Sequence, residues 1–328
     1  MATLRVGFVG AGGNAMGHMK GVKAVPDVEI VGICDVDIER ANKATAELGG
    51  RPYSDAHELL KKEKMDALYV SVPPFAHTDV EIKAARKGIH LFVEKPVALD
   101  MKTGLKVLKA IQAAEVISCV GYQLRYSETV DRARNWLAGR TVAMVNCHRW
   151  GGVPGTPWWR VMSKSGGQLV EQTTHNLDMI RCLCGEIVEV HANYALRLCN
   201  DMPDFDIPDV MATTFKLASG AVGVLTSSCV FTEGGGKGEL EIIAGKKILK
   251  WGHAAISATP GEHPDLAAPV GPIPSIDATF MDAVRTGDSS KIRSPYLDGL
   301  KSLDVTLAMN KSAVIGKPVK PYFATHAE

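Results

Sequence analysis

Residues 4–15, LRVGFVGAGGNA, decide how the first part of the chain folds. Residues 4–9 are a short apolar run rich in branched side chains, which is typical of a buried parallel strand. Gly10, Gly12 and Ala15 then match G-x-G-x-x-G/A, and a helix-like segment follows at 16–25. In this context Gly10 permits a tight turn, Gly12 lets the backbone approach a pyrophosphate, and Ala15 keeps the helix close to the strand. The stretch predicts a dinucleotide site at the N-terminus of that helix.

A second apolar run, VEIVGICD at 28–35, supports the same interpretation. It ends in Asp35, whose carboxylate can accept hydrogen bonds from the adenosine ribose hydroxyls. A carboxylate there repels a 2′-phosphate, which favours NAD over NADP, although Arg40 lies one turn on and softens that preference. The alternative is an ordinary strand-helix turn with a capping aspartate.

Strand and helix patterns continue to alternate after this point. The sequence predicts strands at 66–74 and 89–96, separated and followed by helical patterns, up to a last strand-like run at 117–126. This order is typical of a doubly wound α/β domain with a parallel sheet. We expect that domain to span residues 1–121 and a second domain to span 122–328.

Lys95 ends one of the predicted buried strands, HLFVEKP. Ligands of open parallel sheets bind outside the carboxyl ends of the strands. Pro96 disfavours the α conformation at Lys95, which can direct the side chain into that crevice. The alternative is a strand-end lysine in solvent, as most lysines are.

The bulk composition of the 328 residues excludes several classes of function. A net charge of +1 gives no indication of a nucleic-acid or membrane partner, and no apolar run reaches the length of a membrane span. No basic and apolar leader precedes the first strand, and the seven cysteines include no CxxC pair. We expect reduced thiols in a cytoplasmic protein. The segment GGGKG at 234–238 lacks the context of a phosphate loop and predicts a hairpin.

The stretch 166–179, GGQLVEQTTHNLDM, carries three polar side chains at helical spacing. Glu171, His175 and Asp178 fall on one stripe of an α-helix. Such a stripe can be a metal site, an acid/base site or a solvated surface. A third ligand of cysteine or histidine type is missing, which disfavours zinc. The glycine pair and the polar run 172–174 favour a ligand-facing turn over a solvated face.

The segment RWGGVPGTPWWR at 149–160 predicts a substrate loop. Trp150, Trp158 and Trp159 offer flat apolar faces that stack on sugar rings, and Arg160 can reach the cofactor or an anionic substrate group. Arg125 and Tyr126 lie just after the expected domain boundary and can add hydrogen bonds. The alternative is a surface loop with aromatic anchors.

Four features together resemble the glucose–fructose oxidoreductase/inositol dehydrogenase family (Gfo/Idh/MocA). They are VGFVGAGGNA with Asp35, SVPPFAH at 71–77, the triplet Glu94-Lys95-Pro96, and GGQLVEQTTHNLD; the tail segments 280–288 and 308–320 match more softly. The resemblance spans nearly the whole chain. It implies an N-terminal Rossmann domain, a C-terminal α/β domain on a large open, mostly antiparallel sheet, and a homo-oligomer (dimer or tetramer) formed through the exposed sheet face.

The resemblance also assigns residues. Lys95 matches a lysine that contacts both nicotinamide and substrate, His175 matches the acid/base histidine, and Asp178 matches the last acid of that motif. Glu171 departs from the family, whose inositol dehydrogenases carry the shorter Asp there. The expected cofactor site comprises Gly10, Gly12, Gly13, Asn14, Ala15, Asp35, Arg40, Ser71, Pro73, Pro74, His77, Glu94, Lys95 and Gln123. The expected substrate site comprises Lys95, Arg125, Tyr126, Trp150, Trp158, Trp159, Arg160, Glu171, His175 and Asp178, with no metal.

These residues predict an oxidoreductase that transfers hydride between a secondary hydroxyl of a sugar or cyclic polyol and NAD, with NADP as the second choice. His175 suits proton transfer near neutral pH, Lys95 stabilises a developing alkoxide, and Glu171 binds the hydroxyl or orients His175. One alternative is a glycoside-cleaving enzyme that oxidises C3 transiently, eliminates the aglycone and recycles its NAD. A second is a catalytically silent NAD-binding sensor.

Overall fold

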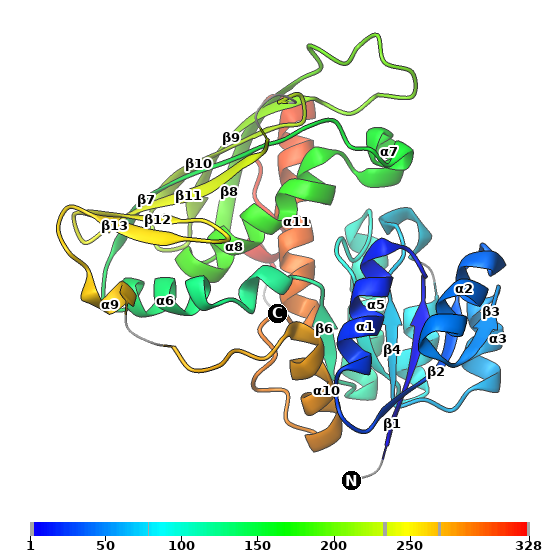
Figure 1. Cartoon of the computed structure of the whole chain (residues 1–328). Helices are drawn as coiled ribbons and strands as arrows, with labels where there is room; N and C mark the ends of the chain where they lie inside the picture. Colours follow the sequence, from blue (N-terminus) through cyan, green and yellow to red (C-terminus); the bar gives the residue numbers. More distant parts are fainter. Residues whose placement is uncertain (1–2, 78, 232–234, 268–269, 327–328) are drawn as a thin grey trace. The chain divides into compact units, whose positions relative to one another are not determined.

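The computed structural model describes residues 3–77, 79–231, 235–267 and 270–326. The chain divides into two compact units, Met1–Gln123 with Pro274–Leu300, and Leu124–Ile273 with Lys301–Glu328 (Figure 1). This division differs from the expected boundary after residue 121, because 274–300 return to the first unit. The pattern of that segment shows an amphipathic helix but not the core against which it packs. Only the tertiary contacts decide that.

The first unit is built on a six-stranded sheet in the order β3-β2-β1-β4-β5-β6, with every neighbouring pair parallel. The order reverses between β1 and β4, so each half of the sheet winds away from that point. The doubly wound fold predicted from the strand and helix alternation is confirmed. The strands are β1 (Leu4–Val9), β2 (Val28–Cys34), β3 (Arg51–Tyr53), β4 (Ala67–Val70), β5 (His90–Val93) and β6 (Ser118–Val120).

Helices cover this sheet because its central strands are apolar on both faces. Phe8, Tyr69 and Phe92 stack side by side across β1, β4 and β5, with ring centroids 4.7 and 4.4 Å apart, and all three are fully buried. Aspartates at the N-caps, such as Asp37 and Asp100, start the helices that follow the strands. The helices are α1 (Gly13–Lys23), α2 (Ile38–Leu48), α3 (Ala56–Lys62), α4 (Val80–Arg86), α5 (Met101–Ala114), α10 (Ile276–Thr286) and the start of α11 (Tyr296–Ile315), with a 3₁₀ turn η1 (Pro74–Ala76).

The second unit is built on a seven-stranded sheet in the order β13-β12-β11-β7-β10-β9-β8. Only the central pair, β7 with β10, is parallel, so the predicted large, mostly antiparallel sheet is confirmed. The strands are β7 (Val142–Trp150), β8 (Ile187–Ala195), β9 (Val210–Leu217), β10 (Val222–Ser228), β11 (Lys237–Ala244), β12 (Lys247–Trp251) and β13 (Ile256–Thr259).

The parallel pair corrects the hairpin prediction for 234–238. Gly234 lies outside the described residues, but the strands that flank it do not pair with each other: β10 and β11 both pair with β7, one on each side. The chain therefore crosses β7 between β10 and β11. Strand-like runs on either side of a glycine-rich segment do not reveal such a crossing.

Helices cover one face of this second sheet (Figure 1). Along β9, Met211, Thr213, Phe215 and Leu217 are buried on that face, whereas Ala212, Thr214 and Lys216 between them are exposed, as period-two alternation requires. The core includes Trp136 of α6, Leu177 and Ile180 of α8, and Met309 of α11, all fully buried. The helical elements are α6 (Glu128–Leu137), α7 (Met162–Ser165), α8 (Thr174–Cys184), α9 (Pro264–Ala267), the rest of α11, a π-helical turn η4 (Leu169–Thr173), and the 3₁₀ turns η2 (Gln123–Arg125), η3 (Pro157–Arg160) and η5 (Tyr322–Ala324).

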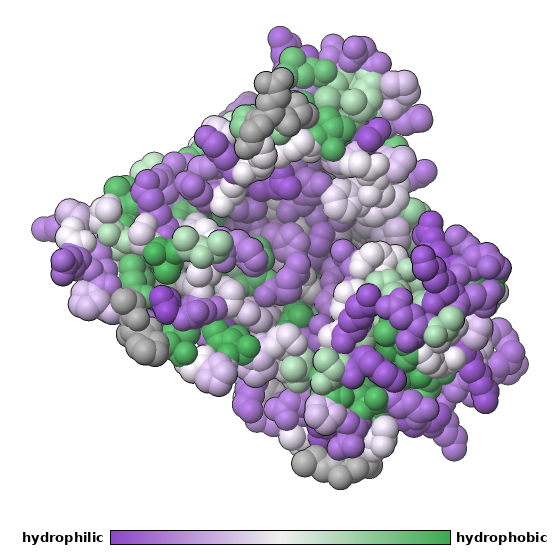
Figure 2. All heavy atoms as spheres, viewed as in Figure 1, coloured by the Kyte–Doolittle hydropathy of each residue, from purple (hydrophilic) through white to green (hydrophobic). Residues whose placement is uncertain are grey.

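Within the described ranges, no helix is both long enough and apolar enough to cross a membrane. The face drawn in Figure 2 mixes hydrophilic and hydrophobic residues. All seven cysteines lie in the described part of the chain, and none of them forms a disulfide with another.

Candidate functional site

The glycine turn of the first unit lies where the strand order reverses. Gly10 follows β1 with φ = 100°, and its N–H donates to the Cys34 carbonyl oxygen at 2.7 Å. A side chain at Gly10 would overlap the carbonyl oxygen of Ser71, which follows the neighbouring strand β4. Both the positive φ and this close approach require glycine. The turn therefore sits at the topological switch point, where open α/β sheets bind their ligands.

The helix that follows has an open N-terminus. Gly12 caps α1, and a Cβ at Gly12 or Gly13 would meet nothing within 4 Å. The first turn of α1 contains no acidic residue, Asn14 is exposed, and Ala15 is fully buried against the sheet. A helix N-terminus with no side-chain cap and no acidic residue in its first turn fits a pyrophosphate.

Asp35 completes this turn from the end of β2. Its carboxylate accepts hydrogen bonds from the N–H groups of Ala11 at 2.8 Å and Asp37 at 2.9 Å. Arg40 is exposed and pairs with Asp37, its Nε lying 3.2 Å from the carboxylate. An acid at this strand end, beside an open glycine turn, fits a dinucleotide with free ribose hydroxyls, as in NAD.

The remaining expected cofactor residues lie at the same edge of the sheet. The Ser71 N–H donates to the Val9 carbonyl oxygen at 2.7 Å, and Pro73 leads into η1, where Pro74 is buried. His77 is buried, with Nδ1 2.5 Å from Oε1 of Glu81. Gln123 begins η2, just after β6.

Lys95 lies two residues beyond β5 and is only 8% exposed, which excludes the solvent-lysine alternative. Glu94 fixes the backbone at this point, because its Oε2 accepts from the Lys95 N–H at 3.1 Å. Gly121 packs so closely on the Glu94 carboxylate that a Cβ there would overlap it. The Lys95–Pro96 peptide is cis.

Sequence reasoning missed His18, which bridges two carboxylates behind this strand end. Its Nε2 lies 2.7 Å from Oε1 of Glu94, and its Nδ1 lies 2.8 Å from Oδ1 of Asp277 on α10. Burial acts to lower the pKa of His18, but the two carboxylates outweigh it and raise the pKa to about 10. Asp277 lies 259 residues away in the chain, so local pattern gave no signal of this cluster.

In the second unit, the expected α-helical stripe begins in a π-helical turn. Gly166 and Gly167, at φ values of 73° and 87°, lead into η4, which contains Glu171, and α8 begins only at Thr174. The wider turn changes the angular offset between Glu171 and His175, so an ideal α-helical stripe is not formed. Glu171 is 4% exposed and His175 is half-buried. The described residues contain no cluster of three or more side chains suited to a metal ion.

A hydrogen bond to the sheet anchors this turn. The hydroxyls of Thr173 on η4 and Ser227 on β10 lie 2.6 Å apart, and both residues are buried. Thr173 stands between Glu171 and His175 in the chain. The anchor therefore ties the segment that carries both residues to β10. π-Turns within helices occur frequently at functional sites.

Asp178 and Arg125, both predicted as substrate ligands, form a buried ion pair with each other. Arg125 Nε and Nη2 each lie 2.7 Å from one oxygen of Asp178, and Ser302 donates to Oδ1 at 2.7 Å. Arg125 is 4% exposed and Asp178 is 1% exposed. A bidentate pair with an added hydroxyl uses most of the lone pairs of the carboxylate. Burial hides both residues from a ligand.

The residues of the predicted substrate loop lie on two different elements, β7 and η3. Trp150 points to the open face of the sheet, opposite Cys147 and Val145, because side chains alternate along β7; its Nε1 donates to Thr226 at 3.1 Å. Trp150 therefore points away from the helix-covered face, on which the turn that carries His175 lies. Trp158 and Trp159 meet edge to face at 5.6 Å in η3, and Arg160 Nε donates to the Pro154 carbonyl oxygen at 2.8 Å. Tyr126 is half-buried beside α6.

Comparison with known proteins identifies both units. Residues 4–122 match an oxidoreductase family with an NAD-binding Rossmann fold, and residues 137–249 match the GFO/IDH/MocA C-terminal domain. The scyllo-inositol 2-dehydrogenase (NAD(+)) of Bacillus subtilis (strain 168) is 26% identical over 340 residues, covering 97% of this chain and 96% of that protein. The 2,7-anhydro-N-acetylneuraminate hydratase of Escherichia coli (strain K12) is 26% identical over 204 residues, covering 60% of this chain and 55% of that protein.

A solved structure shares the whole fold. The WlbA dehydrogenase of Chromobacterium violaceum, in complex with NADH and UDP-GlcNAcA, has a TM-score of 0.85 at 22% identity and covers 98% of this chain and 96% of its own. The stretch that matches the NAD-binding model, residues 4–122, contains the glycine turn, Asp35 and the strand ends described above. The chain therefore belongs to the Gfo/Idh/MocA family of oxidoreductases, and its first unit is the NAD-binding Rossmann domain of that family.

Proposed function

We propose that this protein is an NAD-dependent dehydrogenase that oxidises or forms a secondary hydroxyl of a sugar or cyclic polyol. The observation that carries this proposal is the turn at 169–175, which holds a buried carboxylate and a half-buried imidazole on one anchored element. An acid/base pair of this kind serves proton transfer to and from a hydroxyl. The inositol dehydrogenase relative, which matches nearly the full length of the chain, supports the substrate class.

Three residues carry the proposed chemistry. His175 takes the hydroxyl proton during oxidation and returns it during reduction. Lys95, held at the end of β5, stabilises the developing alkoxide as an ammonium group. Glu171 binds the substrate hydroxyl or orients the imidazole. Bound NAD supplies the hydride acceptor. The glycine turn 10–15 and Asp35 hold it.

The test is a panel of sugars and inositols, assayed for reduction of NAD or NADP by the absorbance of the reduced nicotinamide. We expect at least one substrate, with NAD preferred. His175→Ala is expected to lower kcat by about 10²–10⁴-fold, the usual contribution of a positioned acid/base group. Near-full turnover by His175→Ala would remove the acid/base assignment. Tight NAD binding without turnover of any panel member would support the silent sensor instead.

The relative named as a hydratase favours a second candidate, in which oxidation is transient. Oxidation at C3 of a glycoside acidifies the C2 hydrogen, so that the C2 proton and the C1 aglycone are lost; water then adds at C1, and reduction of the C3 ketone regenerates the NAD. The same residues serve this reaction. Product release from a p-nitrophenyl glycoside without accumulation of NADH would support it, whereas stoichiometric NADH supports the dehydrogenase.

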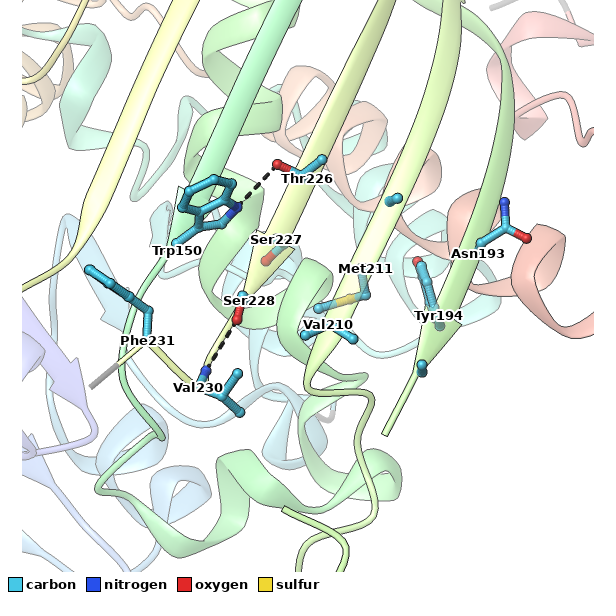
Figure 3. A pocket seen from close by; sticks show the side chains of 12 residues that line it. Trp150, Asn193, Tyr194, Val210, Met211, Thr226, Ser227, Ser228, Val230 and Phe231 are labelled. Carbon is cyan, nitrogen blue, oxygen red and sulfur yellow. Dashed lines mark hydrogen bonds between the residues drawn. The ribbon is translucent and has the colours of Figure 1, made fainter. Parts of the chain in front are cut away.

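We also propose a cytoplasmic homo-oligomer that associates through the open face of the second sheet. That face exposes Met144, Trp150, Val222 and Ile243, each 37–48% exposed. A shallow depression of about 530 Å³ lies between Trp150, Asn193, Val210 and Thr226 on the same face (Figure 3). Apolar groups gathered on an open sheet are typical of association surfaces. Sedimentation of wild type and Val222→Lys tests this: a monomeric wild type would contradict it.

A further inference from the structure

Arg149 lies on the helix-covered face of the second sheet, beside the turn that carries Glu171 and His175. It follows Val145 and Cys147 at period two along β7, and both of those residues are buried under the helices. In the sheet it pairs with Ser227 of β10 on one side and Gly238 of β11 on the other.

Both neighbours of Arg149 reach the turn at 169–176. Ser227 bonds to Thr173 at 2.6 Å, and a Cβ at Gly238 would lie 3.7 Å from Nδ2 of Asn176. The backbone of Arg149 therefore lies directly beneath residues 173–176. Its guanidinium extends along the strand toward the substrate loop, where it packs on Gly151 so closely that a Cβ there would overlap it.

The charge of Arg149 lacks an internal counterion in the described part of the chain. The ion pairs of these residues do not include it, and the group that raises its pKa is the Cys229 thiol. Burial lowers the pKa of the guanidinium, but an arginine stays protonated in proteins. A half-buried cation that keeps its charge is costly unless an anion meets it.

We propose that Arg149 binds a carboxylate of the substrate, so that the preferred substrates are sugar acids and not neutral sugars. This inference rests on the proposed function, because it assigns the substrate of the same turn. A planar guanidinium binds a carboxylate through two parallel hydrogen bonds. One guanidinium neutralises one carboxylate, whereas a phosphate ester would retain excess negative charge.

The test compares matched pairs that differ only at C6: glucose with glucuronate, galactose with galacturonate, and mannose with mannuronate. Binding to the full-length protein is measured by calorimetry with NADH present, and turnover is measured with NAD. We expect at least one acid to bind ten or more times more tightly than its neutral partner. Arg149→Gln is expected to weaken that acid at least tenfold and to change the neutral partner less than twofold.

Matched variants separate the loss of the carboxylate contact from a general structural effect of the substitution. Gly151→Ala displaces the guanidinium while keeping the charge and is expected to reproduce the loss. Arg197→Gln, at an exposed arginine outside the substrate loop, is expected to behave as wild type. If Arg149→Gln does not fold, Gly151→Ala still tests the position of the guanidinium.

Each outcome bears on a different statement. Equal affinity for acids and neutral sugars in all three pairs would overturn the inference, as would an equal loss of both in Arg149→Gln. Glucose 6-phosphate bound more tightly than glucuronate would overturn the carboxylate assignment. Acids that bind through Arg149 but are never oxidised would leave the inference standing and refute the proposed function. Oxidation of a neutral sugar with no preference for acids would refute the inference and leave the proposed function standing.

Discussion

The His18 cluster makes the stability of the first unit depend on pH in a defined direction. His18 lies between the carboxylates of Glu94 and Asp277, at 2.7 and 2.8 Å, and its pKa rises from 6.5 to about 10. A raised pKa in the folded state stabilises that state fully below pH 6.5. The contribution is lost as the pH rises through about 10.

The size of this effect follows from the shift. About 3.5 pKa units at about 1.36 kcal/mol each give a contribution on the order of 5 kcal/mol below pH 6.5. Between pH 7 and pH 9 it should fall by about 3 kcal/mol, because the unfolded chain is then deprotonated at this histidine whereas the folded chain keeps the proton. His18→Gln removes the titrating group, so its destabilisation relative to wild type should shrink by that amount.

The assay is denaturant unfolding of both proteins at pH 7 and pH 9, followed by hydrogen exchange in α1. All five tryptophans lie in the second unit, so their fluorescence reports that unit as an internal control. His57→Gln is a matched control, since His57 is nearly half exposed and pairs with Asp79 only at the surface. The same destabilisation by His18→Gln at both pH values would refute the charged-cluster argument.

Four further changes test other parts of the structure. Asp178→Asn breaks the buried pair with Arg125 and should destabilise the second unit by about 3–5 kcal/mol, measured by tryptophan fluorescence; a change below 1 kcal/mol would contradict the internal role. Gly10→Ala should abolish NAD binding in a calorimeter, because both φ and the Ser71 carbonyl exclude a side chain. Asp35→Ser should raise the NADP/NAD ratio of kcat/KM by at least tenfold; an unchanged ratio would remove Asp35 from ribose recognition. Glu171→Asp, with the carboxylate drawn back by one methylene, should shift the ratio of kcat/KM between inositols and the native substrate, and equal effects on both would exclude a substrate contact.

Local sequence predicted the parts of the fold whose cause is local. The run 4–15 specifies a strand, a turn and a helix through neighbouring residues, because the turn at Gly10 requires a positive φ and the strand before it is apolar throughout. The position of Asp35 is predicted in the same way, because this residue comes directly after the next apolar strand. The buried position of Lys95 was one of two alternatives until the tertiary structure covered it.

Other features depend on residues that are distant in sequence, and no local pattern shows them. Asp178 becomes internal because Arg125 and Ser302 meet it. Trp150 points to the open face because side chains alternate along β7 and helices cover the face of Val145 and Cys147. Alternation along a strand divides its side chains between two faces, but only the packing of distant helices decides which face is covered.

The sequence by itself therefore determined the dinucleotide turn, the class of fold and the residue types available for proton transfer. Only the tertiary structure decided which polar groups neutralise one another. The physical reason is burial: charges such as His18 and Asp178 are stable inside the protein only with partners, and those partners come from remote segments.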